Sequence, residues 1–161
     1  MASSNQQVKV LKGLIWSYLV LLLIEGALRK WVFPGFSNYL VIVRDPVVIL
    51  IYLVAMMSGR FVVNGFVVAN FLLAAATFFA GMLTPESSLV VTFIGLRCYF
   101  LHLPLIFVME RTLDKEDIWR IGKFLLWFAI PETILLVAQF YLPQTNWVNY
   151  SIGGKITQGF S

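Results

Sequence analysis

The chain has 161 residues, of which 60% are hydrophobic and only 12% are charged. This composition excludes a soluble domain, because too few polar side chains are present to cover its surface, and it indicates a membrane protein. The formal charge of +4 does not indicate nucleic-acid binding, since the basic residues stand at the ends of apolar runs and form no patch.

The hydrophobic pattern predicts an all-α fold, a polytopic bundle of about five transmembrane helices within residues 1–143. The apolar run that follows Lys9 and Lys12 is similar to the start of a signal peptide, but no small-residue cleavage site comes after it. Glu25 and Arg29 come instead, four residues apart as in a helical ion pair. The predicted spans have lengths that suit a bilayer and cover residues 11–31, 39–58, 61–83, 89–109 and 121–142.

The second span contains the sequence Arg44-Asp45-Pro46. Asp45 can cap a helix whose first residue is Pro46, where the missing N–H of proline is harmless. A helix from there to Ser58 would be about 20 Å long, which is too short to cross a hydrocarbon core of roughly 30 Å. Either the helix begins near Asn38 and kinks, or a half-helix enters the membrane first.

The third span has small residues along one helical stripe, which predicts close packing against another helix. These residues are Gly65, Ala69, Ala76 and Ala80.

The fourth span is apolar but contains Arg97, His102 and Pro104. An arginine at a helix centre costs roughly 2.5 to 3.5 kcal/mol on insertion, so such a residue usually has a partner or faces a cavity. Proline has no N–H to donate to the carbonyl of Phe100, which frees that acceptor and predicts a kinked helix.

The fifth span follows a charged segment in which Asp114 and Asp117 have the spacing of a helix-capping pair. Pro131 and Glu132 are expected to interrupt this span. Residues 144–161 are polar and rich in glycine, and we interpret them as the start of an extracytoplasmic loop in a chain that is truncated at its C-terminus.

The loop charges predict a cytoplasmic N-terminus, because the cytoplasmic side of membrane proteins is enriched in Lys and Arg. In this orientation the inner side has seven basic residues, namely Lys9, Lys12, Arg60, Arg111, Lys115, Arg120 and Lys123. The outer side has four, namely Arg29, Lys30, Arg44 and Lys155.

Counting about 1.5 Å per residue from the outer end of each span brings four ionisable residues to depths of about 9 to 15 Å. They are Glu25, Asp45, Arg97 and Glu132. We therefore expect Arg97 to pair with Glu132 or Glu25, since an unpaired charge at this depth is costly. The polar layer is either structural, joining helices, or a cavity that opens to the outer face.

The sequence contains no HExxH motif, GxSxG motif, Cys/His cluster or glycine-rich phosphate loop. We therefore expect neither a metal nor a cofactor. The arginines suit an anionic substrate, because a guanidinium binds phosphate with two hydrogen bonds and stays charged when it is desolvated. The candidate substrate-binding residues are Arg44, Arg97 and His102.

Several motifs together resemble the N-terminal part of bacterial O-antigen ligase and O-antigen polymerase-like membrane proteins. They are Glu25-Gly-Ala-Leu-Arg29-Lys30-Trp31, Arg44-Asp45-Pro46, Gly95-Leu-Arg97 with His102-Leu-Pro104, and Trp147-Val-Asn149 leading to Gly159-Phe160-Ser161. The resemblance implies an inner-membrane, metal-independent glycosyltransferase that moves glycan from undecaprenyl diphosphate to a periplasmic acceptor. It also implies that the catalytic residues lie beyond Ser161 and that this part is inactive alone.

Two other classes remain open. A transporter or channel fragment would use Arg97, Glu132 and His102 as an ion or proton relay. The other class is a non-catalytic membrane subunit, which is favoured if the natural gene ends near residue 161.

Overall fold

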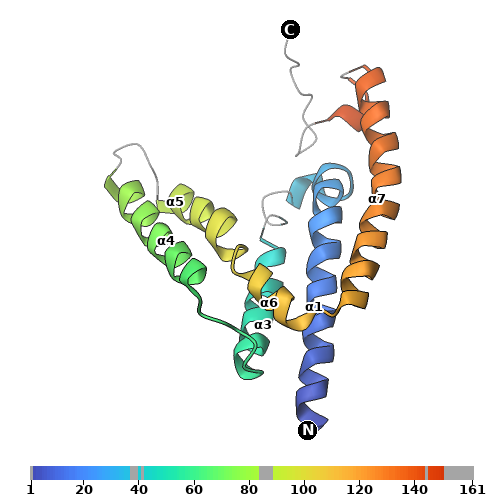
Figure 1. Ribbon diagram of the computed structural model, residues 1–161. Coiled ribbons are helices and arrows are strands. Elements are labelled where there is room, and N and C mark those ends of the chain that lie inside the picture. The colour runs from blue at the N-terminus through green and yellow to red at the C-terminus, as the bar shows by residue number, and fades with distance from the viewer. Residues whose placement is uncertain (1, 37–39, 41, 84–88, 144, 151–161) are drawn as a thin grey trace. The chain divides into compact units, whose positions relative to one another are not determined.

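The computed structural model is helical over the residues that it describes, which are 2–36, 40, 42–83, 89–143 and 145–150 (Figure 1). No β-strand occurs in this part of the chain, which confirms the all-α prediction. The chain divides into two units that alternate along the sequence. Unit 1 comprises Met1–Tyr18 and Asp45–Thr112, and unit 2 comprises Leu19–Arg44 and Leu113–Ser161.

Three helices of the described chain are long and apolar enough to cross a membrane. They cover Asn5–Val32, Gly65–Leu83 and Lys115–Tyr141. These helices match the predicted spans 11–31, 61–83 and 121–142, whereas the predicted spans 39–58 and 89–109 fall on shorter helices. The described part of the chain therefore has three candidate membrane-spanning helices, and a bundle of about five spans is not confirmed.

Helix α1 (Ala2–Ala27) begins well before the predicted start of the first span and continues into a π-helical turn, η1 (Leu28–Val32). Its N-terminal half belongs to unit 1 and buries Leu11, Ile15 and Tyr18. The steps of four and three between these residues place them on one face of the helix, as expected for a helix that packs along one stripe.

A 3₁₀ turn, η2 (Pro34–Phe36), precedes helix α3 (Arg44–Met57). Asp45 lies in the first turn of α3, so the prediction that it caps a helix starting at Pro46 is wrong. With 14 residues, α3 is about 21 Å long, as the half-helix alternative expects. The alternative start near Asn38 lies outside the described residues.

Helix α4 (Gly65–Leu83) begins after Asn64, whose side-chain oxygen accepts a hydrogen bond from the N–H of Val67 at 2.8 Å. This is an N-cap, which the sequence analysis missed. Val67 and Asn70 are the residues that α4 buries. The predicted packing stripe is exposed at each of its members, Gly65, Ala69, Ala76 and Ala80.

The close contact of α4 is made by a different glycine. Helix α5 (Leu89–Leu96) lies beside α4 (Figure 1). Gly81 of α4 faces Thr92 of α5. A Cβ added to this glycine would stand 2.7 Å from the side-chain oxygen of Thr92. The two helices can therefore approach each other at this point only because Gly81 has no side chain.

The predicted fourth span is broken. After α5 come a π-helical turn, η3 (Arg97–Leu101), and helix α6 (Leu105–Thr112). Pro104 has no N–H to donate to the carbonyl of Phe100. The N–H of Leu105 bonds to the carbonyl of His102 at 3.3 Å instead of reaching back four residues to Leu101. The carbonyls of Phe100 and Leu101 therefore both lose their α-helical donors, so the expected kink is a complete break.

Side chains from two other helices satisfy these carbonyls. Asn70 of α4 donates its side-chain N–H to the carbonyl of Phe100 at 3.2 Å, and Tyr52 of α3 donates its hydroxyl to the carbonyl of Leu101 at 2.6 Å. In an apolar environment each freed carbonyl needs such a donor. The break thus ties α3, α4 and the 97–104 segment together within unit 1.

Helix α7 (Lys115–Tyr141) starts with a capping box, as predicted. The N–H of Asp114 donates to the carboxylate of Asp117 at 3.1 Å, and the side chain of Asp114 accepts a hydrogen bond in return. The helix continues through Pro131, so the predicted interruption there is wrong.

A short 3₁₀ turn, η4 (Trp147–Asn149), folds back onto the end of α7. The side-chain amide of Asn149 donates to three carbonyls, those of Gln139, Leu142 and Pro143, at distances of 3.1, 2.9 and 3.2 Å. The beginning of the predicted loop is therefore a defined turn in unit 2, and residues 151–161 lie outside the described part.

We predict that Asn70→Leu lowers the free energy of unfolding by about 1 kcal/mol, because it leaves the carbonyl of Phe100 without a donor in an apolar surrounding. The loss should shrink in a Pro104→Ala background, where the new alanine supplies a backbone N–H. Equilibrium unfolding in detergent, followed by circular dichroism, measures both values. Thr77→Val, which removes an exposed intrahelical bond on α4, is the control and should change little. An equal loss in both backgrounds would contradict the assignment.

Candidate functional site

Four polar side chains of unit 1 form a group that we name the Asp45 cluster: Tyr18, Asp45, Arg97 and His102. The Nε atom of Arg97 forms an ion pair with Oδ2 of Asp45. The Nε2 atom of His102 lies 3.6 Å from Oδ1 of the same carboxylate. The other ring nitrogen of His102 lies 3.4 Å from the hydroxyl of Tyr18, and the two rings stack at 5.7 Å. One carboxylate therefore organises the whole cluster.

The π-helical turn η3 explains how Arg97 and His102 reach the same carboxylate. In an α-helix, residues five apart point about 140° away from each other. The i→i+5 hydrogen bonds of a π turn bring such residues toward one side. Asp45 receives them from the first turn of α3, where the positive end of the helix dipole favours a negative charge.

The Asp45 cluster is largely shielded from its surroundings. Asp45 is 7% exposed, and the side chains of Arg97 and His102 are 15% and 17% exposed. The guanidinium and the carboxylate compensate each other, as a charge in an apolar segment requires.

A second group lies within unit 2, and we name it the Glu25 cluster: Glu25, Arg29 and Arg44. The predicted helical pair is confirmed, with Nη1 of Arg29 at 3.5 Å from Oε1 of Glu25. The Nε atom of Arg44 pairs with the other oxygen, Oε2. Glu25 is 7% exposed. With two guanidinium groups for one carboxylate, this cluster has a net positive charge.

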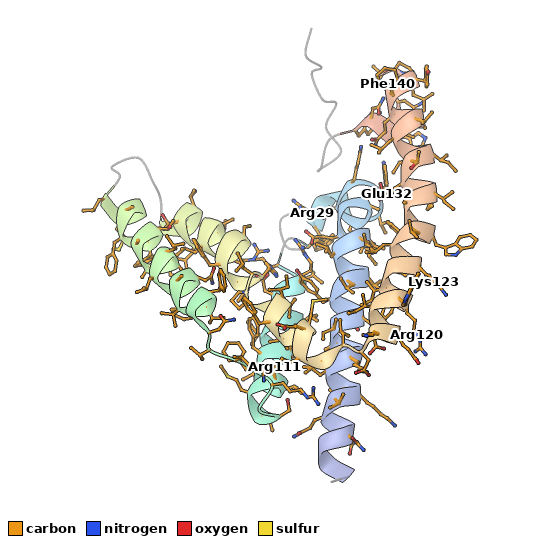
Figure 2. The ribbon with its side chains drawn as sticks, viewed as in Figure 1. Arg29, Arg111, Arg120, Lys123, Glu132 and Phe140 are labelled. Carbon is orange, nitrogen blue, oxygen red and sulfur yellow. The ribbon has the colours of Figure 1, made fainter. Side chains whose placement is uncertain are left out.

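The expected partner of Arg97 was Glu132 or Glu25, and the ion pair that the structure describes for Arg97 is instead with Asp45. Glu25 forms ion pairs with two arginines of unit 2, Arg29 and Arg44. Glu132 is exposed on α7 (Figure 2). The number of residues along a span gives the depth of a side chain in the membrane but not its direction around the helix axis. That direction decides which side chains come into contact.

Three residues of unit 1 were missed by the sequence analysis: Tyr18, Tyr52 and Asn70. Each donates or shares a hydrogen bond across helices. The available signal was that a tyrosine hydroxyl or an amide inside an apolar run needs a partner. The freed carbonyl of Phe100 was predicted, but the side chain that donates a hydrogen bond to it was not.

An apolar cavity of about 360 Å³ lies next to the break in unit 1. Phe100, Leu101 and Pro104 contribute to its wall, together with Phe71 and Ala74 of α4. The same 97–104 segment thus borders an apolar cavity and also supplies Arg97 and His102 to the Asp45 cluster.

Among the described residues, no group of three or more His, Cys, Asp or Glu side chains is arranged to hold a metal ion.

Comparisons with protein-family models, with curated proteins and with solved structures found no match.

We predict that Arg97→Leu lowers the free energy of unfolding by about 3 kcal/mol or more, because it leaves the Asp45 carboxylate without its guanidinium in a shielded position. Adding Asp45→Asn to Arg97→Leu should restore most of the loss. Unfolding titrations in detergent measure the three variants.

The control is Arg120→Ala, which breaks an ion pair with Glu116 whose side chains are 70% and 86% exposed. Exposed pairs contribute less than about 1 kcal/mol, so this control should change little. If Arg97→Leu has an effect of the same size as this control, the pair with Asp45 does not stabilise the protein.

Proposed function

We propose that the chain is part of a glycan ligase or polymerase of the bacterial inner membrane, and that unit 1 holds the lipid diphosphate that carries the glycan. The observation that supports this most directly is that the broken segment supplies Arg97 and His102 to the Asp45 cluster and Phe100, Leu101 and Pro104 to the wall of an apolar cavity. The motif resemblance to O-antigen ligase and polymerase-like proteins supports the same class. The proposed contribution of this chain is to hold substrate, and we assign no catalytic residue to it.

Arg97 is the proposed contact for the diphosphate. Its guanidinium presents a planar set of donors that matches two phosphate oxygens and remains charged when water is removed. Asp45 keeps this charge compensated and oriented before substrate arrives. His102, which already lies against the same carboxylate, is placed to donate a further hydrogen bond when it is protonated.

The apolar cavity is the proposed site for part of the isoprenoid tail. Its volume of about 360 Å³ falls within the range of roughly 300 to 1,000 Å³ that is common for ligand pockets. Its wall includes the aromatic rings of Phe71 and Phe100. A tail that enters here would run beside the residues that follow Arg97 in the chain.

The sequence also predicts that Arg44 binds an anion, and this arginine belongs to the Glu25 cluster of unit 2. The Glu25 cluster has a surplus of one positive charge, which favours the approach of an anion. Glu25 holds the guanidinium of Arg44 in a fixed orientation.

We also propose the topology of a multi-pass inner-membrane protein with a cytoplasmic N-terminus, on the charge distribution of the loops. In this topology α3 and the broken segment α5–η3–α6 enter the membrane, as the three longer helices do. Their interrupted backbone suits that environment, because Tyr52 and Asn70 satisfy the freed carbonyls.

One observation favours a second candidate, a transporter that couples transport to protons. Tyr18, His102 and Asp45 form a row of exchangeable groups with separations of 3.4 and 3.6 Å. Such rows occur in proton relays of membrane transporters. In this alternative Arg97 would set the charge of the row and would bind no substrate.

The test is binding of undecaprenyl diphosphate to the full chain in lipid nanodiscs. We expect Arg97→Lys to weaken binding at least tenfold, because an ammonium keeps the charge and loses the two-pronged geometry. Arg120→Lys on the exposed start of α7 is the matched control and should bind as the wild type does. Free diphosphate should compete, which separates recognition of the head group from general uptake of an apolar lipid.

Two results would overturn the proposal: no saturable binding by the wild type, or equal affinity in Arg97→Lys and the control. Proton flux in vesicles that contain the chain tests the second candidate. The transporter candidate would be established if the protein does not bind the diphosphate and if proton flux is lost in His102→Gln.

A further inference from the structure

Unit 2 contains a pocket of about 710 Å³ that neither ion-pair cluster uses. Its wall combines the end of α1 and η1 with the last turns of α7 and with η4. Glu132 and Phe140 come from α7, with Glu132 on the side toward η1 (Figure 2). The volume is large enough for a drug-sized ligand.

The pocket has one side chain of each charge. Lys30 lines it from η1, and Glu132 lines it from α7. Their formal charges cancel, so the pocket does not favour a diphosphate or another strong anion. Lys30 supplies donors, Glu132 supplies acceptors, and both can bind a neutral molecule that has many hydroxyl groups.

Two amide side chains in the wall are held in place by the backbone of unit 2. The Nε2 atom of Gln139 donates to the carbonyl of Val148 at 3.2 Å. Asn149 donates to the carbonyl of Gln139 at 3.1 Å and to two carbonyls beyond it. The polar groups are therefore oriented before a ligand binds, which lowers the entropy cost of binding.

Aromatic side chains complete the wall. Trp31, Phe140 and Tyr150 line the pocket. Trp31 is fixed by an edge contact with Trp147, with ring centroids 6.1 Å apart, and by Lys30, whose Nζ lies 5.1 Å from the ring centroid. Aromatic rings offer flat apolar faces beside polar edges, and the C–H face of a sugar ring packs against such a surface.

From this combination we infer that the pocket binds a sugar ring. Balanced charge, fixed amide groups and aromatic faces together suit a neutral, hydroxyl-rich ligand better than a lipid tail or a phosphate. This inference deepens the proposed function and rests on it for the source of the sugar, which would be a residue of the transferred glycan. The sugar site itself is a property of unit 2 and needs no contribution from the Asp45 cluster.

The test is saturation-transfer NMR on the full chain in nanodiscs of phosphatidylglycerol, with glucose, galactose, rhamnose and N-acetylglucosamine as probes. We expect at least one sugar to give signals that fall at least tenfold in Trp31→Ala and in Glu132→Gln. Because Glu132 is exposed, its substitution leaves the fold intact and keeps the test decisive if Trp31→Ala misfolds.

The matched controls lie at the other end of α7. Glu116→Gln removes an exposed carboxylate, and Trp119→Ala removes a tryptophan that also has a lysine near its ring, Lys123 at 5.8 Å. Both controls should keep the sugar signals. The inference is overturned if no sugar gives a signal with the wild type, or if the controls lose as much signal as the pocket variants.

Two further arms separate the possible failures. If sugar binding is absent while undecaprenyl diphosphate still binds, the pocket inference falls and the proposed function stands. If sugar binds and the diphosphate does not, the pocket stands without the proposed carrier. If the sugar signals disappear in phosphatidylethanolamine nanodiscs and only that head group contacts Trp31, the pocket is a lipid site and the inference is overturned.

Discussion

The missing N–H of Pro104 is the constraint on which the arrangement of unit 1 depends. It leaves acceptors on Phe100 and Leu101 in an apolar segment, and such groups must find donors within the protein. Tyr52 and Asn70 provide them, and in doing so they fix α3 and α4 against the break. The π turn before the break then turns Arg97 and His102 toward Asp45 at the start of α3. The break at Pro104 and the π turn before it thus account together for the helix packing and the polar cluster of unit 1.

Local signals were predictable from the sequence, because their physics is confined to a few neighbouring residues. The capping box of Asp114 and Asp117, the helical pair of Glu25 and Arg29, and the three long apolar helices all follow from spacing alone. The partner of Arg97 did not follow, since it depends on rotation around helix axes and on which helices are neighbours. The packing stripe predicted on α4 differs from the observed contact for a related reason. Small residues permit the close approach of another helix, but they do not determine which helix packs against them. Gly81, next to Ala80, makes the contact.

The two ion-pair clusters use the same types of side chain for different electrostatic results. In the Asp45 cluster one carboxylate meets one guanidinium and an imidazole, so the formal charges of carboxylate and guanidinium cancel. In the Glu25 cluster one carboxylate meets two guanidinium groups, so one formal positive charge is left over. Arg44 and Asp45 are consecutive in the chain, yet their side chains join different clusters.

The order of the hydrogen-bond partners along the chain also matters for biogenesis. Tyr52 and Asn70 are synthesised before the carbonyls of Phe100 and Leu101 that they satisfy. Because chains are synthesised from the N-terminus, both donors are present in the chain before the broken segment leaves the ribosome. An arrangement with the donors placed after the break would leave both carbonyls without these partners until a later helix was made.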